Sequence, residues 1–272
     1  MNTQQKEFVH IIKRFYRKNR RDLPWRKTTN PYKILVSEVM LQQTQVSRVE
    51  KKYPEFLHAF PTMRSLAKAP TADVLRVWQG MGYNRRALAL KKAAEAIVSK
   101  YKGKVPNDPA LLEKLPGIGP YTARAISTFA FDQPEVFIET NIRRVYIHHF
   151  FSLGYPTSKL VHDTEIMLLI ETTLDKKNPR EWYWALMDYG AHLSKQAKNP
   201  NRKSAHYVRQ SKFKGSNREV RGKILKLLTE RRIVTESTLT KSIPHDNLAP
   251  NLIALEHEGF IQKHGKTYTI KN

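Results

Sequence analysis

The sequence predicts a mostly helical protein with a small α+β domain at its C-terminus. Three observations lead to this prediction. Apolar residues recur at helical spacing through about the first 195 residues, where little alternates in the way a strand does. A short glycine turn at residues 115–123 lies between two helix-forming runs. From residue 217 onward, three short helical patterns are followed by a hairpin pattern.

The helical runs carry recognisable start signals. The first run begins near Phe8 and has an apolar face with a period of three to four residues. Asn30 followed by Pro31 is an N-cap with proline at the first helical position, and it predicts a helix over 32–45. Further helical patterns cover residues 85–101, 141–151, 158–174 and 180–195.

The turn at 115–123 is the most informative local feature. Gly117 and Gly119 permit a tight turn and close approach of another backbone, and Pro120 starts the next helix. The N–H groups at the start of that helix suit a phosphate. The turn therefore predicts a helix–hairpin–helix that grips a nucleic-acid backbone, although an ordinary turn between two helices has the same pattern.

Composition favours a polyanionic partner. The chain has 272 residues with 48 Lys and Arg against 24 Asp and Glu, a formal charge of +24. Such a charge is typical of nucleic-acid binding, because each neutralised phosphate releases counterions. A general solubility charge or a ribosome-associated protein is the alternative.

The sequence also excludes several classes of protein and of metal site. No run of about 18 apolar residues exists, so no membrane span is predicted. The N-terminus lacks the apolar region of a signal peptide, which places the protein in the cytoplasm by expectation. There are 0 cysteines, which excludes disulfides and cysteine-ligated zinc or iron–sulfur clusters. The histidines show no metal-site spacing, so no metal or cofactor is expected.

A basic connector at residues 196–216 separates the helical region 1–195 from the C-terminal region 217–272. From Lys195 to Arg221 the single acidic residue is Glu219, and the segment either is solvated or lies on phosphates. Residues 217–272 then carry three helical patterns and a hairpin at about 260–270, which together describe a winged helix. Such modules bind duplex DNA or other proteins, and the basic lead-in favours DNA.

Glu38 is the first candidate for chemistry. It lies among the apolar residues Val36, Val39, Met40 and Leu41 on the helix after Pro31. A carboxylic acid in an apolar pocket has a raised pKa and can donate a proton near neutral pH. The alternative is a surface glutamate on an amphipathic helix.

Glu139 is the second candidate. It ends an apolar run and directly precedes a helix that starts at Thr140–Asn141. The helix N-terminus can hold its carboxylate in the ionised form, or the residue can be a simple helix cap. A protonated acid together with an ionised carboxylate is the pair that cleavage of a bond to a sugar C1 requires.

Five motifs occur in order along the chain: Pro24-Trp-Arg, Ser37-Glu-Val-Met-Leu-Gln-Gln-Thr-Gln, Gly80-Met-Gly-Tyr, Leu115-Pro-Gly-Ile-Gly-Pro-Tyr-Thr-Ala and Asn141-Ile-Arg-Arg-Val. They resemble the motifs of MutY-type adenine DNA glycosylases, in the helix–hairpin–helix (HhH-GPD, endonuclease III-like) superfamily. The resemblance covers roughly residues 5–195, and Ser37–Thr44 is its most specific part. It implies a two-lobed helical fold, with one lobe at about 30–136 and another from 1–29 and 137–195. A flipped base would lie between the lobes.

The resemblance also implies residue roles. Glu38 matches the acid that protonates the leaving base, Glu139 takes the place of the catalytic aspartate, and Asn141 positions that carboxylate. Tyr121 stands where lyase members carry lysine, which implies hydrolysis without a Schiff base. The residues expected at the base pocket or as wedges are Trp25, Arg26, Gln43 and Tyr83. The residues expected on the DNA backbone are Gly117, Gly119, Thr122, Arg85, Arg86, Lys198, Arg202 and Lys203.

The chain departs from the MutY pattern in three respects. Glu139 stands where the family has aspartate, and the extra methylene shifts the carboxylate by roughly 1 Å, which can cost on the order of 100-fold in rate. The four-cysteine iron–sulfur loop expected after Asp188-Tyr-Gly-Ala is replaced by basic residues 195–214. A winged helix replaces the large domain that recognises 8-oxoguanine. Asn84 also replaces a second tyrosine.

The expected function is that of a monofunctional DNA glycosylase acting on mismatched adenine opposite guanine or 8-oxoguanine. The expected partner is double-stranded DNA with a mismatched or damaged base, bound by a monomer near the nucleoid. A glycosylase for thymine, uracil or another altered base opposite guanine is one alternative. A non-catalytic lesion-binding protein is the other.

Overall fold

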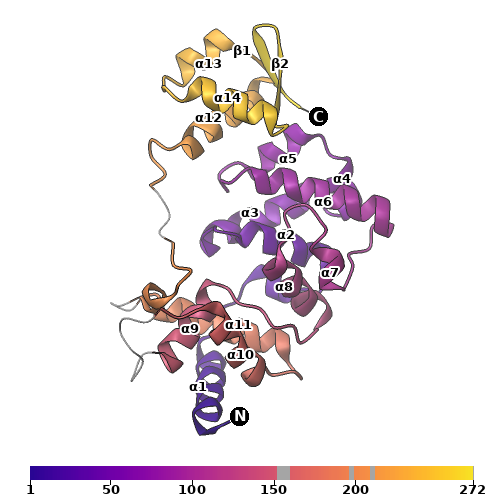
Figure 1. Ribbon diagram of the computed structural model, residues 1–272. Coiled ribbons are helices and arrows are strands. Elements are labelled where there is room, and N and C mark those ends of the chain that lie inside the picture. The colour runs from indigo at the N-terminus through magenta and orange to yellow at the C-terminus, as the bar shows by residue number, and fades with distance from the viewer. Residues whose placement is uncertain (152–159, 196–198, 209–211, 272) are drawn as a thin grey trace. The chain divides into compact units, whose positions relative to one another are not determined.

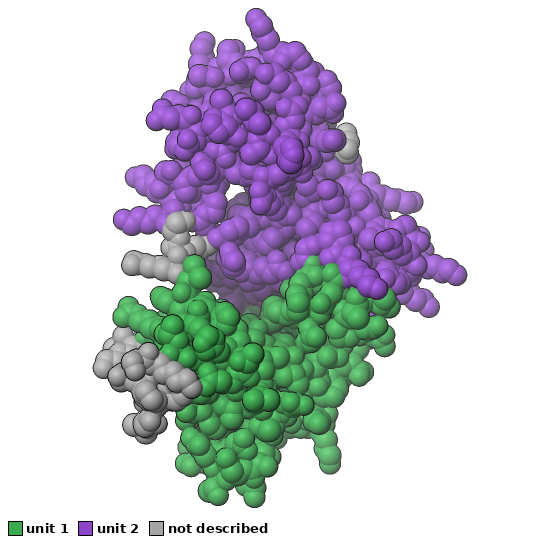
Figure 2. Space-filling model, in the orientation of Figure 1, with its two compact units in different colours: residues 1–34, 107–113, 118–209 green, residues 35–106, 114–117, 210–272 purple. Residues whose placement is uncertain are grey.

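The computed structural model describes residues 1–151, 160–195, 199–208 and 212–271. The chain forms two compact units (Figures 1 and 2). Unit 1 comprises residues 1–34, 107–113 and 118–209, and unit 2 comprises residues 35–106, 114–117 and 210–272. The predicted fold class is confirmed: helices dominate the described residues, and the named strands all lie in the C-terminal domain.

Unit 1 is a helical bundle in which the expected helices are present, although the one expected over 158–174 begins at Asp163. Its elements are α1 (Thr3–Asn19), η1 (Pro24–Lys27), α7 (Pro109–Leu112), α8 (Pro120–Phe131), α9 (Thr140–Phe150), α10 (Asp163–Thr173), α11 (Pro179–Leu193) and η2 (Pro200–Lys203). α11 packs against α1, α8 and α9. Phe8 fills the centre, with its ring 5.0 Å from that of Tyr146 and 6.1 Å from that of Trp182.

The second helix of the hairpin belongs to unit 1. Residues 118–136, which the predicted boundary assigns to the first lobe, cluster with unit 1 because α8 packs on α7 and α11. Helix α2 (Pro31–Leu41) starts within unit 1 and continues into unit 2. It ends before residue 45, where the sequence predicted its end, because Gln43 has a φ of +52°, outside the right-handed helical region. The Asn30 side chain caps it as expected, by accepting the N–H groups of Tyr32 and Lys33.

Unit 2 combines the central helices with the C-terminal domain. Its helices before the hairpin are most of α2, α3 (Val46–Ala59), α4 (Met63–Lys68), α5 (Thr71–Trp78) and α6 (Arg85–Tyr101). α6 packs against α4 and α5, and α3 packs against α5. The buried rings of Phe56 and Trp78 meet edge to face at 5.9 Å.

The C-terminal domain is a winged helix. It contains α12 (Asn217–Arg231), β1 (Ile233–Thr235), α13 (Glu236–Ser242), α14 (Leu248–His257), β2 (Ile261–His264) and β3 (Thr267–Ile270). The antiparallel sheet has the order β1-β3-β2. The hairpin was predicted, whereas β1 was not, because its three residues are too few to show an alternating pattern.

The winged helix is joined to the central helices of unit 2. α12 packs against α5. Glu258 accepts guanidinium hydrogen bonds from Arg85 of α6, at 2.5 and 2.7 Å, and from Arg221 of α12, at 2.5 and 3.0 Å. These two cations lower the pKa of Glu258 to about 2. Across the described residues, no helix is long and apolar enough to cross a membrane.

Candidate active site

Glu139 is the N-cap of α9, and its carboxylate is held by the helix that follows. One oxygen, Oε1, accepts the main-chain N–H groups of Asn141 at 2.8 Å and Ile142 at 2.9 Å. The other, Oε2, accepts the Asn141 side-chain amide at 3.2 Å. Glu139 therefore caps α9, and Asn141 also positions its carboxylate, so that three donors hold this group.

The surroundings of Glu139 set its pKa by opposing effects. Removal of solvent from the half-buried residue's carboxyl group is the largest effect, and it raises the pKa. The N–H groups of Asn141 and Ile142 lower it, as do the guanidinium groups of Arg144 and Arg143. The net pKa is raised, because desolvation outweighs the N–H groups of the helix end and the two guanidinium groups.

Arg144 and Gly190 hold Asn141 in place. Buried Arg144 donates through Nη1 to Asn141 Oδ1 and to the carbonyl of Gly190, both at 2.8 Å. Gly190 of α11 lies so near that an added Cβ would stand 2.7 Å from the Cβ of Asn141. Only glycine leaves room there, so α11 determines where the start of α9 can lie.

The segment after α11 folds onto both ends of α9. The buried side chain of Asn201 donates to the Thr140 carbonyl at 3.0 Å, next to Glu139. Lys203 donates through Nζ to the Phe151 carbonyl at 3.0 Å, which caps the other end of the helix. Lys203, expected on DNA phosphates, thus binds a helix C-terminus. Arg202 is exposed, whereas Lys198 lies outside the described residues.

Glu38 lies in unit 2, on a helix that is buried on all sides. Glu38 is 4 % exposed, and residues 34–40 of α2 are all buried. The alternative of a surface glutamate on an amphipathic helix is therefore wrong. Glu38 and Glu139 belong to different units.

Gln43 follows α2 in a conformation that L-residues rarely adopt. Its φ is +52°, and its side chain is exposed. Arg86 of α6 holds this turn, since its guanidinium donates to the carbonyls of Met40 at 2.9 Å and Gln42 at 2.5 Å. A strained, exposed residue on a fixed turn fits the expected wedge.

Arg86 was expected on the DNA backbone, and the structure directs its guanidinium into the protein instead. Beyond the α2 turn, it donates to Thr44 Oγ1 at 2.9 Å and to the Gly82 carbonyl at 3.1 Å. Burial lowers its pKa to about 10. These bonds join the turn after α2 to the Gly80–Tyr83 loop, so Arg86 fixes the position of one segment against the other. Arg85 is paired with Glu258, as described above.

Trp25 and Arg26, expected near the target base, are both buried in unit 1. Arg26 has a side chain 7 % exposed and forms a two-pronged ion pair with buried Asp188, at 2.8 and 2.9 Å. Arg21 binds the same carboxylate at 2.6 Å. These cations lower the pKa of Asp188, so η1 is tied to α11 by an ionised pair.

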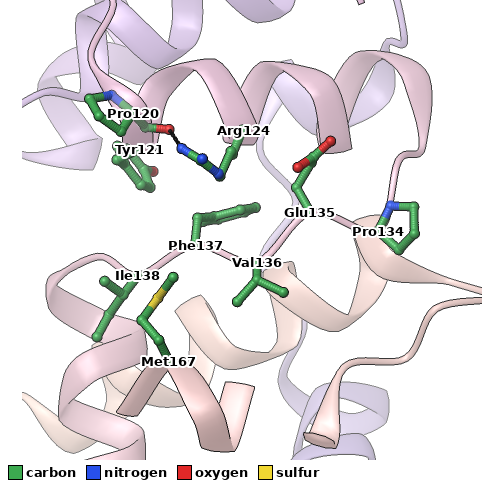
Figure 3. Close-up of a pocket in the computed structure, with 9 residues that line it drawn as sticks. All are labelled: Pro120, Tyr121, Arg124, Pro134, Glu135, Val136, Phe137, Ile138 and Met167. Atoms are coloured by element: carbon green, nitrogen blue, oxygen red, sulfur yellow. Dashed lines mark hydrogen bonds between the residues drawn. The ribbon is translucent and has the colours of Figure 1, made fainter. Parts of the chain in front are cut away.

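Tyr121 lines a pocket of about 580 Å³ in unit 1 (Figure 3). The pocket lies between α8, the extended residues 134–138 and α10, with Arg124 and Met167 on its wall. The Tyr121 ring meets the Phe137 ring edge to face at 5.7 Å. Ile138, which also lines the pocket, directly precedes Glu139.

The hairpin glycines differ in what they require. Gly117 has φ +76°, and an added Cβ would stand 2.7 Å from the Cβ of Ala89. Gly119 is extended and caps α8, with open space where a Cβ would lie. A phosphate can therefore approach the start of α8 at Gly119. Thr122, also expected on the DNA backbone, is buried, so its side chain does not face a phosphate.

The HhH-GPD model, which describes a superfamily of base excision DNA repair proteins, matches residues 36–165. The chain is 36 % identical over 235 residues to the adenine DNA glycosylase of Mycobacterium tuberculosis (strain CDC 1551 / Oshkosh), covering 79 % of this chain and 76 % of that protein. It is 32 % identical to the thymine/uracil-DNA glycosylase of Methanothermobacter thermautotrophicus, covering 70 % of this chain and 86 % of that one. A solved thermostable thymine-DNA glycosylase matches with a TM-score of 0.64 and 29 % identity, over 75 % of this chain and 94 % of that chain.

The chain belongs to the HhH-GPD superfamily. The identification of a MutY-like base excision repair glycosylase from its motifs is thereby confirmed.

The iron–sulfur cluster implied by that resemblance does not fit this HhH-GPD chain. The position of its loop holds Asn199–Ala205, whose polar side chains bind α9, and the sequence has no cysteine to ligate iron. Among the residues that the structure describes, no cluster of three or more His, Asp or Glu is arranged to hold a metal ion. In this part of the fold, Asn201 and Lys203 make hydrogen bonds to the two ends of α9.

Sequence analysis did not identify several residues that hold the candidate site residues in place. They are Arg144, Asp188, Gly190, Asn201 and Glu258. Asp188-Tyr-Gly190 was visible as a motif, and a glycine inside a helical pattern is a signal of close packing. Asn201 and Glu258 carry no local signal, because their partners lie tens of residues away in the sequence.

Proposed function

We propose that this chain is a monofunctional DNA glycosylase that hydrolyses the N-glycosidic bond of a mismatched base, with adenine opposite guanine or 8-oxoguanine as the first substrate. The observation that carries the proposal is the Glu139 carboxylate, fixed by three donors at the start of α9. A fixed anion stabilises the positive charge that develops on the sugar as the bond breaks.

Each proposed step conserves atoms and charge. Glu38 gives its proton to the base, and the C1′–N bond breaks with its electron pair leaving on the base. Glu139 stabilises the resulting cationic sugar. The oxygen of a water molecule then bonds to C1′, and one proton of that water passes to the Glu38 carboxylate, which restores the resting protonation of both groups. With tyrosine at position 121, no Schiff base forms there, so we propose hydrolysis without strand cleavage.

DNA binding is proposed through the start of α8 at Gly119, the exposed Arg202 and the strong net charge of +24. The similarity to an adenine DNA glycosylase at 36 % identity supports adenine as the base removed. A second candidate is thymine or uracil opposite guanine, supported by the relative of that name, of which 86 % is covered.

The test is a panel of duplexes bearing A:G, A:8-oxoG, T:G, U:G and hypoxanthine pairs, treated with alkali after incubation. We expect product from the adenine duplexes, and no strand break before alkali. Product from T:G or U:G alone would establish the second candidate. Tight binding without product on any duplex would show a non-catalytic lesion-binding protein and overturn the proposal.

A further inference from the structure

Aromatic rings and arginines alternate in a continuous run through unit 2. The guanidinium carbon of Arg86 lies 5.4 Å from the ring centre of Trp78 and 5.5 Å from that of Tyr83. The guanidinium carbon of Arg218 lies 5.4 Å from the centre of the same Tyr83 ring and 5.9 Å from that of Phe213. Each cation therefore contacts two rings, within the range of favourable cation–π contacts.

The run begins in the core and ends at the surface. Trp78 is 0 % exposed, whereas Phe213 is 58 % exposed. Lys212 and Lys214, on either side of Phe213, are also exposed. A large aromatic side chain between two exposed cations is the composition of a nucleic-acid stacking site, in which the ring stacks on a base and the cations contact phosphates.

Phe213 is held in place by the winged helix. Arg218, in the first turn of α12, donates to the Tyr83 hydroxyl at 2.9 Å and to the Lys212 carbonyl at 3.4 Å. The Phe213 carbonyl accepts the main-chain N–H of Ser216 at 3.1 Å and its hydroxyl at 2.6 Å. A preorganised ring loses little conformational freedom when it binds.

We infer that Phe213 is a stacking platform for the DNA base that is left unpaired when its partner is flipped out, with Lys212 and Lys214 on the adjacent phosphates. The inference rests on the proposed function, since it assumes a flipped base. An unpaired base has lost its hydrogen bonds and part of its stacking, so it gains more from an aromatic surface than a paired base does. The connector and α12 thereby contribute to recognition of the opposite strand.

The experiment uses the full chain and two duplexes that cannot be cleaved. One carries 2-aminopurine opposite a tetrahydrofuran abasic analogue, and the other carries 2-aminopurine paired with thymine. The variants are Phe213→Leu, which keeps an apolar side chain without an aromatic face, and Phe213→Tyr, which keeps the face. Ile253→Ala, an exposed apolar residue of α14 in the same unit, is the matched control.

We expect Phe213→Leu to weaken binding to the abasic-analogue duplex by about 5- to 100-fold. We also expect it to abolish the change in 2-aminopurine fluorescence that binding of the wild type causes. Binding to the paired duplex should remain close to that of the wild type. Phe213→Tyr and Ile253→Ala should behave as the wild type on both. Wild-type binding by Phe213→Leu, or equal weakening on both duplexes, would overturn the inference, because a ring that merely anchors the connector does not distinguish them.

The outcome is separable from that of the proposed function. Base removal by the wild type without any effect of Phe213→Leu would contradict the platform alone. A Phe213 effect on the abasic-analogue duplex, with no base removal from any mismatch, would contradict catalysis alone.

Discussion

Gly190 of α11 lies against Asn141 of α9 with no room for a side chain between them. An added methyl group would stand 2.7 Å from the Asn141 Cβ and closer still to its carbonyl oxygen. Asn141 in turn provides two of the three donors to the Glu139 carboxylate. Helix packing in unit 1 therefore determines the position of a proposed catalytic group.

Gly190→Ala should slow base removal by on the order of 100-fold, since a shift of about 1 Å at a catalytic group has that effect. Binding to an uncleavable duplex should change little, because the substitution lies in the core. The measurement is a single-turnover rate. Gly222→Ala on α12, where an added Cβ meets nothing within 4 Å, is the matched control and should be active. A wild-type rate for Gly190→Ala would show that Asn141 is not positioned by α11.

The pH dependence should report the raised pKa of Glu139. Only the ionised carboxylate stabilises a cationic sugar, so the rate should rise with pH through that pKa and fall on acidification. The acidic limb should lie above the ordinary value of 4.5.

Arg144→Met removes a cation that lowers this pKa and should move the limb to still higher pH. The measurement is the single-turnover rate as a function of pH for both proteins. A limb below the ordinary carboxyl value, or a shift to lower pH in Arg144→Met, would assign the limb to another group.

Arg202 and Lys203 are adjacent cations that should differ in their contribution to DNA binding. Lys203 binds the Phe151 carbonyl, whereas the Arg202 side chain is exposed. Arg202→Met should reduce the slope of log affinity against log salt by about 0.9. Lys203→Met should leave the slope unchanged and lower the midpoint of unfolding. A reduced slope in Lys203→Met would place Lys203 on a phosphate.

Arg85 and Arg86 form a second matched pair. Arg86→Met removes the guanidinium that donates to the carbonyls of Met40, Gln42 and Gly82 and should destabilise the protein by about 2–4 kcal/mol. Arg85→Met leaves Glu258 paired with Arg221 and should have a smaller effect. Denaturant unfolding measures both. Equal losses would contradict the positioning role of Arg86.

The sequence predicted the helices of unit 1, the helix–hairpin–helix turn and the winged helix, because their signals are local. Asn30 at an N-cap, Pro120 at a first helical position and the apolar periods act within a few residues. It also singled out Glu38 and Glu139 on their surroundings. It did not predict which cationic side chains bind protein and which remain exposed, because Arg26, Arg86 and Lys203 find their acceptors through tertiary packing.

The pKa direction at Glu139 illustrates the same limit. The helix that starts at Thr140 was visible, and it does donate to the carboxylate. The extent of desolvation depends on α11 and η2, which pack on α9 from distant parts of the sequence. Desolvation is the larger effect, so the sequence predicted the donors to the carboxylate but not the direction of its pKa.

The central claim is that one carboxyl group donates a proton and another stabilises the sugar cation in base removal from DNA. The most direct measurement is the single-turnover rate on an A:8-oxoG duplex, read after alkali, for the wild type, Glu38→Gln and Glu139→Gln. Glu135→Gln, a carboxyl group four residues before Glu139, is the control. The account predicts loss of base removal in the first two variants, with duplex binding retained and Glu135→Gln active. Base removal at the wild-type rate by either Glu38→Gln or Glu139→Gln would contradict it.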